Sequence, residues 1–149
     1  MKRLDSKLLP FVLAGLQILG ISALLVTQPL EYISTIVLIV SISGIFLGIW
    51  SLWTMRKSRL NILPDIRKGA VLVTSGPYYL IRHPMYTSLL LTFIPLFLNH
   101  PTGFRLGALI VLISALVGKI RYEEPLLRNH FPEYQSYTRR TWKMIPWVY

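Results

Sequence analysis

The stretch that decides the fold is residues 32–55, which read YISTIVLIVSISGIFLGIWSLWTM without a single charged side chain. About 24 residues at a helical rise of about 1.5 Å each can cross a hydrocarbon core of roughly 30 Å. A second uncharged stretch, Leu8–Thr27, precedes it and is about 20 residues long. Apolar runs of this length are typical of transmembrane helices, so the sequence predicts an integral membrane protein.

Two further apolar stretches occupy about residues 84–98 and 104–120. The first is short, because about 15 residues span only ~22 Å as a helix, so it either spans with its ends in the interface or enters without fully crossing. Brief connections join the first two stretches and the last two. We therefore expect one all-α membrane domain, residues 1–149, in which about four transmembrane helices (8–27, 32–55, 84–98 and 104–120) form two antiparallel hairpins, followed by a cytoplasmic C-terminal helical segment.

The composition agrees with a membrane location, because only 15% of the 149 residues are charged and 53% are hydrophobic. A soluble domain carries about 25% charged residues. The chain has no cysteine, which excludes a disulfide framework, a thiolate metal site and a cysteine nucleophile. The first stretch is too long for the apolar region of a signal peptide and no small-x-small cleavage site follows it, so we expect a retained span.

The net charge of +10 is distributed unevenly along the chain. All but one of the 16 Lys and Arg residues lie before the first stretch, between the second and third, or at and beyond the end of the fourth; the exception is Arg105. The positive-inside rule predicts that both termini and the long middle connection are cytoplasmic. Topology and anionic lipid headgroups then account for the charge, and no nucleic-acid partner is expected.

Two clusters hold the residue types that could carry chemistry. The first is residues 75–86, SGPYYLIRHPMY, which begins with a glycine-proline turn signal. Pro84 suits the first turn of a helix, whose N-terminus offers free backbone N–H groups to an anion. His83 and Tyr86 would then lie on one side of that turn.

The second cluster comprises RYEEPLL, residues 121–127, and FPEYQSY, residues 131–137. Glu123 and Glu124 stand at the end of an apolar stretch, where burying a carboxylate is costly unless it is paired. The available cationic partners are Arg82, Arg121 and Arg128. Headgroup anchoring, a helical ion pair or an interfacial aromatic belt could explain each feature singly, but the combination at these spacings favours a site.

In this order the motifs resemble the isoprenylcysteine carboxyl methyltransferase superfamily, which includes phospholipid N-methyltransferases. Its pattern is Gly-x-Tyr-x-x-x-Arg-His-Pro-x-Tyr, a helical hairpin, Glu-Glu-x-x-Leu, then Phe-Gly-x-x-Tyr-x-x-Tyr and a late proline. The chain carries the pattern over residues 72–146, about half its length, with Pro132 where the family usually has glycine. These enzymes are integral membrane methyltransferases that use S-adenosylmethionine.

The resemblance implies a set of cofactor-binding residues near the cytoplasmic surface and no metal. They are Gly76, Tyr78, Arg82, His83, Pro84, Tyr86, Glu123, Glu124, Leu127, Tyr134 and Tyr137. The chemistry is compatible, because tyrosine faces and carboxylates suit a sulfonium cation, and a helix N-terminus or arginine suits the cofactor's carboxylate. The chain has no Gly-x-Gly-x-x-Gly motif after a strand, which excludes a Rossmann methyltransferase.

Methyl transfer is an in-line displacement, for which an enzyme mainly aligns the reactants and excludes water. A carboxylate acceptor needs only a cation to place it, and Arg82, Arg139 and Arg140 are the candidates. An amine acceptor needs a base, and Glu124 and His83 are the candidates.

We expect a lipophilic or prenylated acceptor to enter sideways from the bilayer between the spans. Glycines on these spans permit close helix contact, namely Gly44, Gly48, Gly107 and Gly118. The methyl acceptor stays open between a prenylcysteine carboxylate, a phospholipid amine and another isoprenoid. Two other classes compete: an enzyme like the sterol reductases that use NADPH, and a non-enzymatic scaffold whose basic loops bind anionic lipid.

Overall fold

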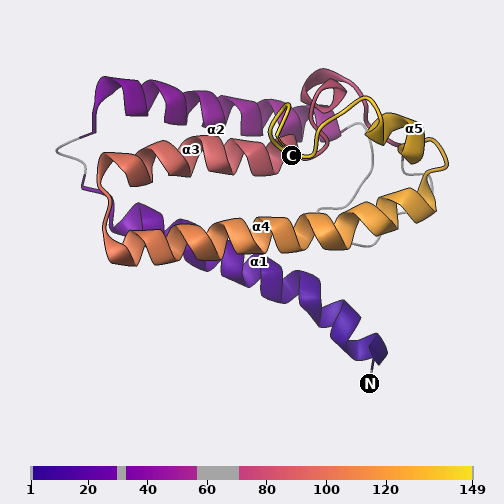
Figure 1. The fold of residues 1–149 in the computed structure, drawn as a ribbon, viewed down its shortest axis with the longest axis horizontal. Helices are drawn as coiled ribbons and strands as arrows, with labels where there is room; N and C mark the ends of the chain where they lie inside the picture. Colours follow the sequence, from indigo (N-terminus) through magenta and orange to yellow (C-terminus); the bar gives the residue numbers. More distant parts are fainter. Residues whose placement is uncertain (1, 30–32, 57–70, 149) are drawn as a thin grey trace.

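The computed structural model describes residues 2–29, 33–56 and 71–148, and its secondary structure is helical (Figure 1). The elements are α1 (Lys2–Val26), α2 (Thr35–Met55), the 3-10 helix η2 (Gly76–Tyr79), α3 (Pro84–Asn99), α4 (Gly103–His130) and α5 (Tyr134–Thr138). The described ranges contain no extended strand, only an isolated parallel bridge between Ile81 and Trp142.

Three helices are long and apolar enough to cross a membrane: α1 over Leu8–Val26, α2, and α4. Helix α3 is a shorter apolar helix, as its sequence predicted. The all-α class is therefore confirmed for the described residues, and three of the helices have the length and apolar composition of membrane spans. The fourth span and the cytoplasmic location of the termini stay predictions, and Lys57, Arg59, Arg67 and Lys68, which contributed to the orientation, lie outside the described residues.

The direction of the chain alternates from α1 to α4 (Figure 1). The main packing partners are α2 with α3 and α1 with α4, so the molecule has two layers of two helices. The sequence expectation had paired helices across their short connections. A short connection fixes the direction of the next helix, whereas complementary side chains decide which helix it packs against.

Small and hydroxyl-bearing side chains form the interface between α2 and α3. A Cβ atom added to Gly44 would lie 2.5 Å from Thr92 Oγ1 and 2.8 Å from the Thr92 backbone nitrogen, so the two backbones meet closely at this point. Ser41 Oγ donates a hydrogen bond of 3.0 Å to the Thr92 carbonyl. Gly48 similarly faces Ser88. These contacts explain why α2 selects α3, since small residues allow helices in lipid to approach closely.

The interface between α1 and α4 uses Gly118, where an added Cβ would lie 2.8 Å from Leu13 Cδ2. The core beside it contains the fully buried Leu112, Leu116 and Ile120. Gly107 was also expected to permit a helix contact, and this expectation is wrong. Gly107 is exposed and an added Cβ there would meet nothing within 4 Å, because that face of α4 points away from α1.

Arg105, the exception in the charge distribution, is buried with 1% of its surface exposed. Its guanidinium donates to the Thr27 carbonyl at 2.9 Å, to Gln28 Oε1 at 2.6 Å and to the Leu96 carbonyl at 2.7 Å. The side chain therefore ties the start of α4 to the end of α3 and to the chain that leaves α1. Protein oxygens accept from both terminal nitrogens of this cation, while its buried Nε has no hydrogen-bond partner among the described residues.

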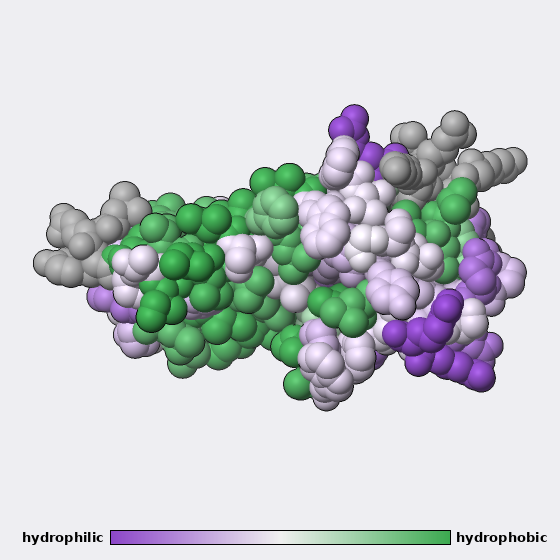
Figure 2. All heavy atoms as spheres, turned by 90° about the horizontal axis from the view of Figure 1, so that it is seen from above, coloured by the Kyte–Doolittle hydropathy of each residue, from purple (hydrophilic) through white to green (hydrophobic). Residues whose placement is uncertain are grey.

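Helix α4 continues ten residues beyond the apolar stretch that ends at about residue 120, and it passes through Pro125. The apolar pattern marks only the hydrophobic part of a helix, while backbone hydrogen bonds let the helix extend past it. Glu123 and Glu124 are consequently held on a rigid helix. On the face shown in Figure 2, hydrophobic residues cover much of the half away from α5, and hydrophilic residues gather toward the end where α5 lies.

We predict that Gly44→Ala lowers the stability of the protein while Gly107→Ala does not. The new methyl group at residue 44 would overlap the Thr92 backbone, and overpacking of this kind costs about 1–3 kcal/mol. The methyl group at residue 107 meets open space, and alanine favours a helix over glycine by up to about 1 kcal/mol. Unfolding by SDS titration in detergent micelles measures both. Equal stabilities of wild type and Gly44→Ala would contradict the α2–α3 contact.

Candidate active site

The site begins at the turn that carries the chain from α2 toward α3. Gly76 has a φ of +59°, a conformation that glycine adopts readily and other residues rarely do. A Cβ there would also lie 3.0 Å from Thr54 Oγ1 at the end of α2. The turn leads into η2, which packs against α2 and buries Pro77 and Tyr78. The geometry of the turn therefore explains why residue 76 is a glycine. Gly76 does not line the cavity described below.

The C-terminal segment holds the next residues by backbone hydrogen bonds. The Arg82 N–H donates to the Trp142 carbonyl at 2.8 Å, and the His83 N–H donates to the Lys143 carbonyl at 2.9 Å. The Trp142 N–H returns a bond of 3.1 Å to the Leu80 carbonyl. No periodic pattern predicts this pairing, because each partner is a single short segment. It places Arg82 and His83 immediately before α3, which starts at the buried Pro84.

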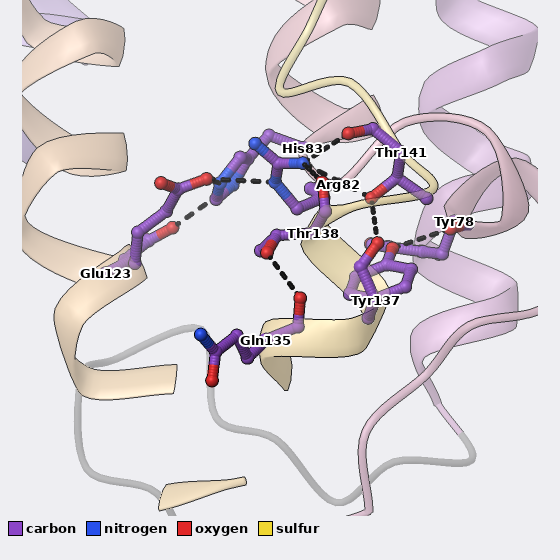
Figure 3. Close-up of polar contacts among 9 residues, drawn as sticks. Tyr78, Arg82, His83, Glu123, Gln135, Tyr137, Thr138 and Thr141 are labelled. Atoms are coloured by element: carbon purple, nitrogen blue, oxygen red, sulfur yellow. Dashed lines mark hydrogen bonds and ion pairs between the residues drawn. The ribbon is translucent and has the colours of Figure 1, made fainter. Parts of the chain in front are cut away.

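Arg82 joins α3 to the other layer. Its Nε lies 3.0 Å from Glu124 Oε1, and both side chains are nearly buried, 8% and 12% exposed. A terminal nitrogen of the same guanidinium donates to the Thr138 carbonyl at 3.2 Å, to Thr141 Oγ1 at 3.3 Å and to the Thr141 carbonyl. Figure 3 shows the guanidinium between α4 and the segment that follows α5. These additional acceptors offset the cost of burying the charge.

His83 and Tyr86 complete the contact between the two clusters. His83 Nδ1 lies 3.7 Å from Glu123 Oε2, and its Nε2 lies 3.7 Å from Glu124 Oε1. The imidazole stacks on Tyr86 with ring centroids 5.5 Å apart and planes 6° apart. The Tyr86 hydroxyl donates to Glu123 Oε1 at 2.5 Å. Residues 37 and 42 positions apart in the chain therefore form one polar cluster.

Three buried tyrosines lie beside this cluster. The Tyr137 hydroxyl donates to the Tyr78 carbonyl at 2.6 Å, as Figure 3 shows. Burial raises the pKa of Tyr137 to about 12 and raises the pKa values of Tyr78 and Tyr134 further. These phenols therefore stay protonated at physiological pH and act as hydrogen-bond donors rather than bases. The hydroxyl of Tyr134, which is 1% exposed, has no hydrogen-bond partner among the described residues.

A cavity of about 450 Å³ lies against the polar cluster. Its polar wall contains Arg82, His83, Tyr86, Glu123, Tyr134 and Tyr137. Its apolar wall is contributed by three helices and contains Ile45, Ile49, Leu52, Leu89, Leu126 and Leu127. The volume falls within the range of small-molecule and cofactor sites, roughly 300–1,000 Å³.

Three of the residues expected to be catalytic do not line the cavity. Glu124 does not line the cavity and instead pairs with Arg82, which does. Arg139 and Arg140 are exposed and do not line it. Three polar residues of the cavity wall were missed, Gln17 on α1, Ser88 on α3 and Lys119 on α4. Lys119 was missed because a lysine near the end of an apolar stretch is ordinarily explained by contact with headgroups. Gln17 lies in the middle of the Leu8–Val26 span, and the motif pattern did not include it.

Within residues 2–29, 33–56 and 71–148, no group of three or more His, Asp or Glu side chains is placed to hold a metal ion.

Comparison with protein families supplies the assignment. A family model described as phospholipid methyltransferase matches residues 30–134, well over half of the chain. The chain belongs to the phospholipid methyltransferase family. The match confirms the resemblance to the superfamily of integral membrane methyltransferases that the sequence motifs indicated.

Two curated relatives share part of the sequence. One is the nickel-cobalt-cadmium resistance protein NccN of Alcaligenes xylosoxydans xylosoxydans, 38% identical over 82 residues. The other is the cobalt-zinc-cadmium resistance protein CzcN of Cupriavidus metallidurans, 40% identical over 82 residues. Each match covers 54% of this chain but only 38% of the relative. No solved structure matches this family member significantly.

We predict that Tyr137→Phe destabilises the site and that Tyr79→Phe, a matched change on an exposed tyrosine, does not. Removing the Tyr137 hydroxyl leaves the Tyr78 carbonyl without that donor in a buried position, which costs about 1–3 kcal/mol. A surface change typically stays within about 0.5 kcal/mol. SDS unfolding of the two variants tests this, and a Tyr137→Phe protein as stable as Tyr79→Phe would refute the contact.

Proposed function

We propose that this protein transfers a methyl group from S-adenosylmethionine to a lipophilic acceptor that reaches the site from the bilayer. One observation carries the proposal. The stretch Arg82–Tyr86 and the carboxylates of α4 meet in a single polar cluster, and that cluster forms one end of a largely apolar cavity. Such a cavity suits one polar cofactor and one hydrocarbon-bearing acceptor.

The residues at the polar end fit the cofactor. The Tyr134 hydroxyl is buried and has no hydrogen-bond partner among the described residues, so it can bond a hydroxyl or amino group of a ligand. His83 Nε2 also lacks a hydrogen bond there and lies 3.7 Å from Glu124 Oε1. Glu123 keeps 29% of its side chain exposed and offers a carboxylate to a positive group. The rings of Tyr86 and Tyr134 suit a sulfonium cation. S-adenosylmethionine supplies a methyl group that is electrophilic because its sulfur is positively charged.

We assign different roles to the two neighbouring carboxylates. Glu123 lines the cavity with Tyr86 and binds the cofactor directly. Glu124 is a positioning residue, because it holds the Arg82 guanidinium and lies outside the lining. If the acceptor is an amine, His83 is therefore the better base candidate of the two proposed from the sequence, since it lies on the cavity wall. If the acceptor is a carboxylate, Arg82 is the cation beside it.

Lateral entry of the acceptor is supported by α2. Ile45, Ile49 and Leu52 are 53%, 61% and 44% exposed, yet they also line the cavity. The cavity wall is thus continuous with an apolar outer surface of a spanning helix. A lipid tail on that surface can reach the cavity without crossing water, so its hydrocarbon stays in an apolar environment throughout.

The cofactor prediction uses Glu123→Gln. The substitution keeps the shape of the side chain but removes its charge, so we expect the affinity for S-adenosylmethionine to fall at least tenfold, about 1.4 kcal/mol. Isothermal titration calorimetry in detergent measures the affinity. Glu133→Gln is the control, because Glu133 is exposed and does not line the cavity. Unchanged affinity in Glu123→Gln would remove this residue from the cofactor site.

The activity prediction uses purified protein, methyl-labelled S-adenosylmethionine and a panel of prenylcysteine, phospholipid and quinone-type acceptors. We expect label in at least one lipid, and a rate reduced at least tenfold in His83→Ala, about 1.4 kcal/mol. Binding of NADPH instead of S-adenosylmethionine would favour a reductase. Binding of neither, with retention of anionic lipid, would favour a scaffold.

A further inference from the structure

We propose that Lys119 and Gln17 form an anion-binding subsite that anchors the acceptor by a carboxylate or phosphate oxygen close to its reacting atom. This inference rests on the proposed methyl transfer and narrows its substrate class to lipids with an anionic oxygen group. Both residues line the cavity, and neither belongs to the two clusters that the sequence singled out.

The contacts of Lys119 leave its charge available to a ligand. Its Nζ donates to Gln17 Oε1 at 2.8 Å and lies 5.4 Å from the centre of the Tyr86 ring. The ion pairs found among the described residues join Arg82 and His83 to the two α4 carboxylates and do not include Lys119. An ammonium has three donors, and the neutral Gln17 oxygen accepts from only one of them. A cation on a cavity wall with neutral partners is suited to an anionic ligand.

A lysine near the end of a spanning helix often extends outward to the headgroups, and this is the ordinary explanation for such a residue. The geometry argues against it here. Lys119 is half-buried and contacts α1 through Gln17 and α3 through the Tyr86 ring, so its side chain lies between the two layers. Arg121 and Arg128 on the same helix are exposed and are available for the headgroups.

The short separation between Lys119 and the residues proposed to hold the cofactor determines which acceptors can bind with their anionic group on Lys119. Glu123 follows it by one helical turn, a rise of about 6 Å, and Tyr86 contacts both residues. An anion on Lys119 therefore lies near the groups proposed to hold the cofactor. A carboxylate that is itself methylated meets this requirement, and so does a phosphate a few bonds from a methylated amine. A neutral isoprenoid does not.

The apolar wall places the rest of the acceptor. Ile45 and Ile49 of α2 and Leu89 of α3 line the same cavity as Lys119. A lipid held by its anionic group at Lys119 can therefore lay its hydrocarbon along α2 toward the bilayer. The subsite and the lateral opening together describe an acceptor with one anionic end and one long apolar end.

Native mass spectrometry of the purified protein, with defined lipids added in detergent, tests the subsite without requiring turnover. The lipids are dioleoylphosphatidylethanolamine, farnesylcysteine and the uncharged dioleoylglycerol. We expect the wild type to retain at least one of the two anionic-oxygen lipids at least tenfold more tightly than dioleoylglycerol. Lys119→Met should lose this preference, and Lys119→Arg should keep it. The lipid that responds to the change identifies whether the anion is a phosphate or a carboxylate.

Arg121→Met is the matched control, since it removes an exposed positive charge two residues away on the same helix. It should leave the preference unchanged. An unaltered preference in Lys119→Met, or an equal loss in Arg121→Met, would overturn the subsite in favour of general attraction to surface charge. Gln17→Leu is a second variant for the case in which Lys119→Met does not fold. Loss of the Gln17 contact should weaken the preference for anionic lipids. An unaltered preference in Gln17→Leu would count against the subsite.

Calorimetry with S-adenosylmethionine on the same samples separates the two proposals. A wild type that does not bind the cofactor would contradict the proposed function. A wild type that binds it, together with a Lys119→Met protein that keeps the lipid preference, would contradict only the subsite.

Discussion

The ion pair between Arg82 and Glu124 is the contact on which the site depends. It joins Arg82, two residues before α3, to the extended end of α4, 42 positions later in the chain. A buried pair is stable only when its remaining donors and acceptors are satisfied. Here Thr138 and Thr141 supply those acceptors, so the segment after α4 must fold back for the pair to exist. The C-terminal segment is therefore part of the site rather than an appendage.

Two arginines connect the helical layers at opposite ends of the molecule. Arg105 joins α4 to the end of α3 and to the chain after α1, and Arg82 joins the start of α3 to α4. Between them the contact of α3 with α4 is limited compared with the contacts inside each layer. The cavity lies on the Arg82 side, where α2, α3 and α4 contribute an apolar wall. A hydrophobic cluster that includes Leu90 and Phe93 of α3 and Leu112 and Leu116 of α4 joins the layers between the two arginines.

The sequence could predict what depends on local pattern. Apolar runs identified the spanning helices, and the spacing of Arg82, His83 and Tyr86 identified one half of the site. It could not predict that α2 packs on α3, because that choice depends on the fit of Gly44 against Thr92. Nor could it distinguish Glu123 from Glu124: adjacent residues on a helix point about 100° apart, so one faces the cavity and the other faces Arg82. Lys119 was interpreted as one of the basic residues that set the membrane orientation. Its hydrogen bond to Gln17 exists only because α1 packs against α4, which the sequence pattern did not predict.

A double-mutant cycle on Arg82 and Glu124 tests the central claim most directly. Arg82→Met, Glu124→Gln and the double variant would be unfolded reversibly in mixed detergent and SDS micelles. Each single variant leaves a buried group without its main partner, so the account predicts a coupling free energy of at least about 1 kcal/mol, with the double variant less destabilised than the sum of the two. Effects that add to within about 0.5 kcal/mol would show that the two segments do not meet, and the site would not exist as described.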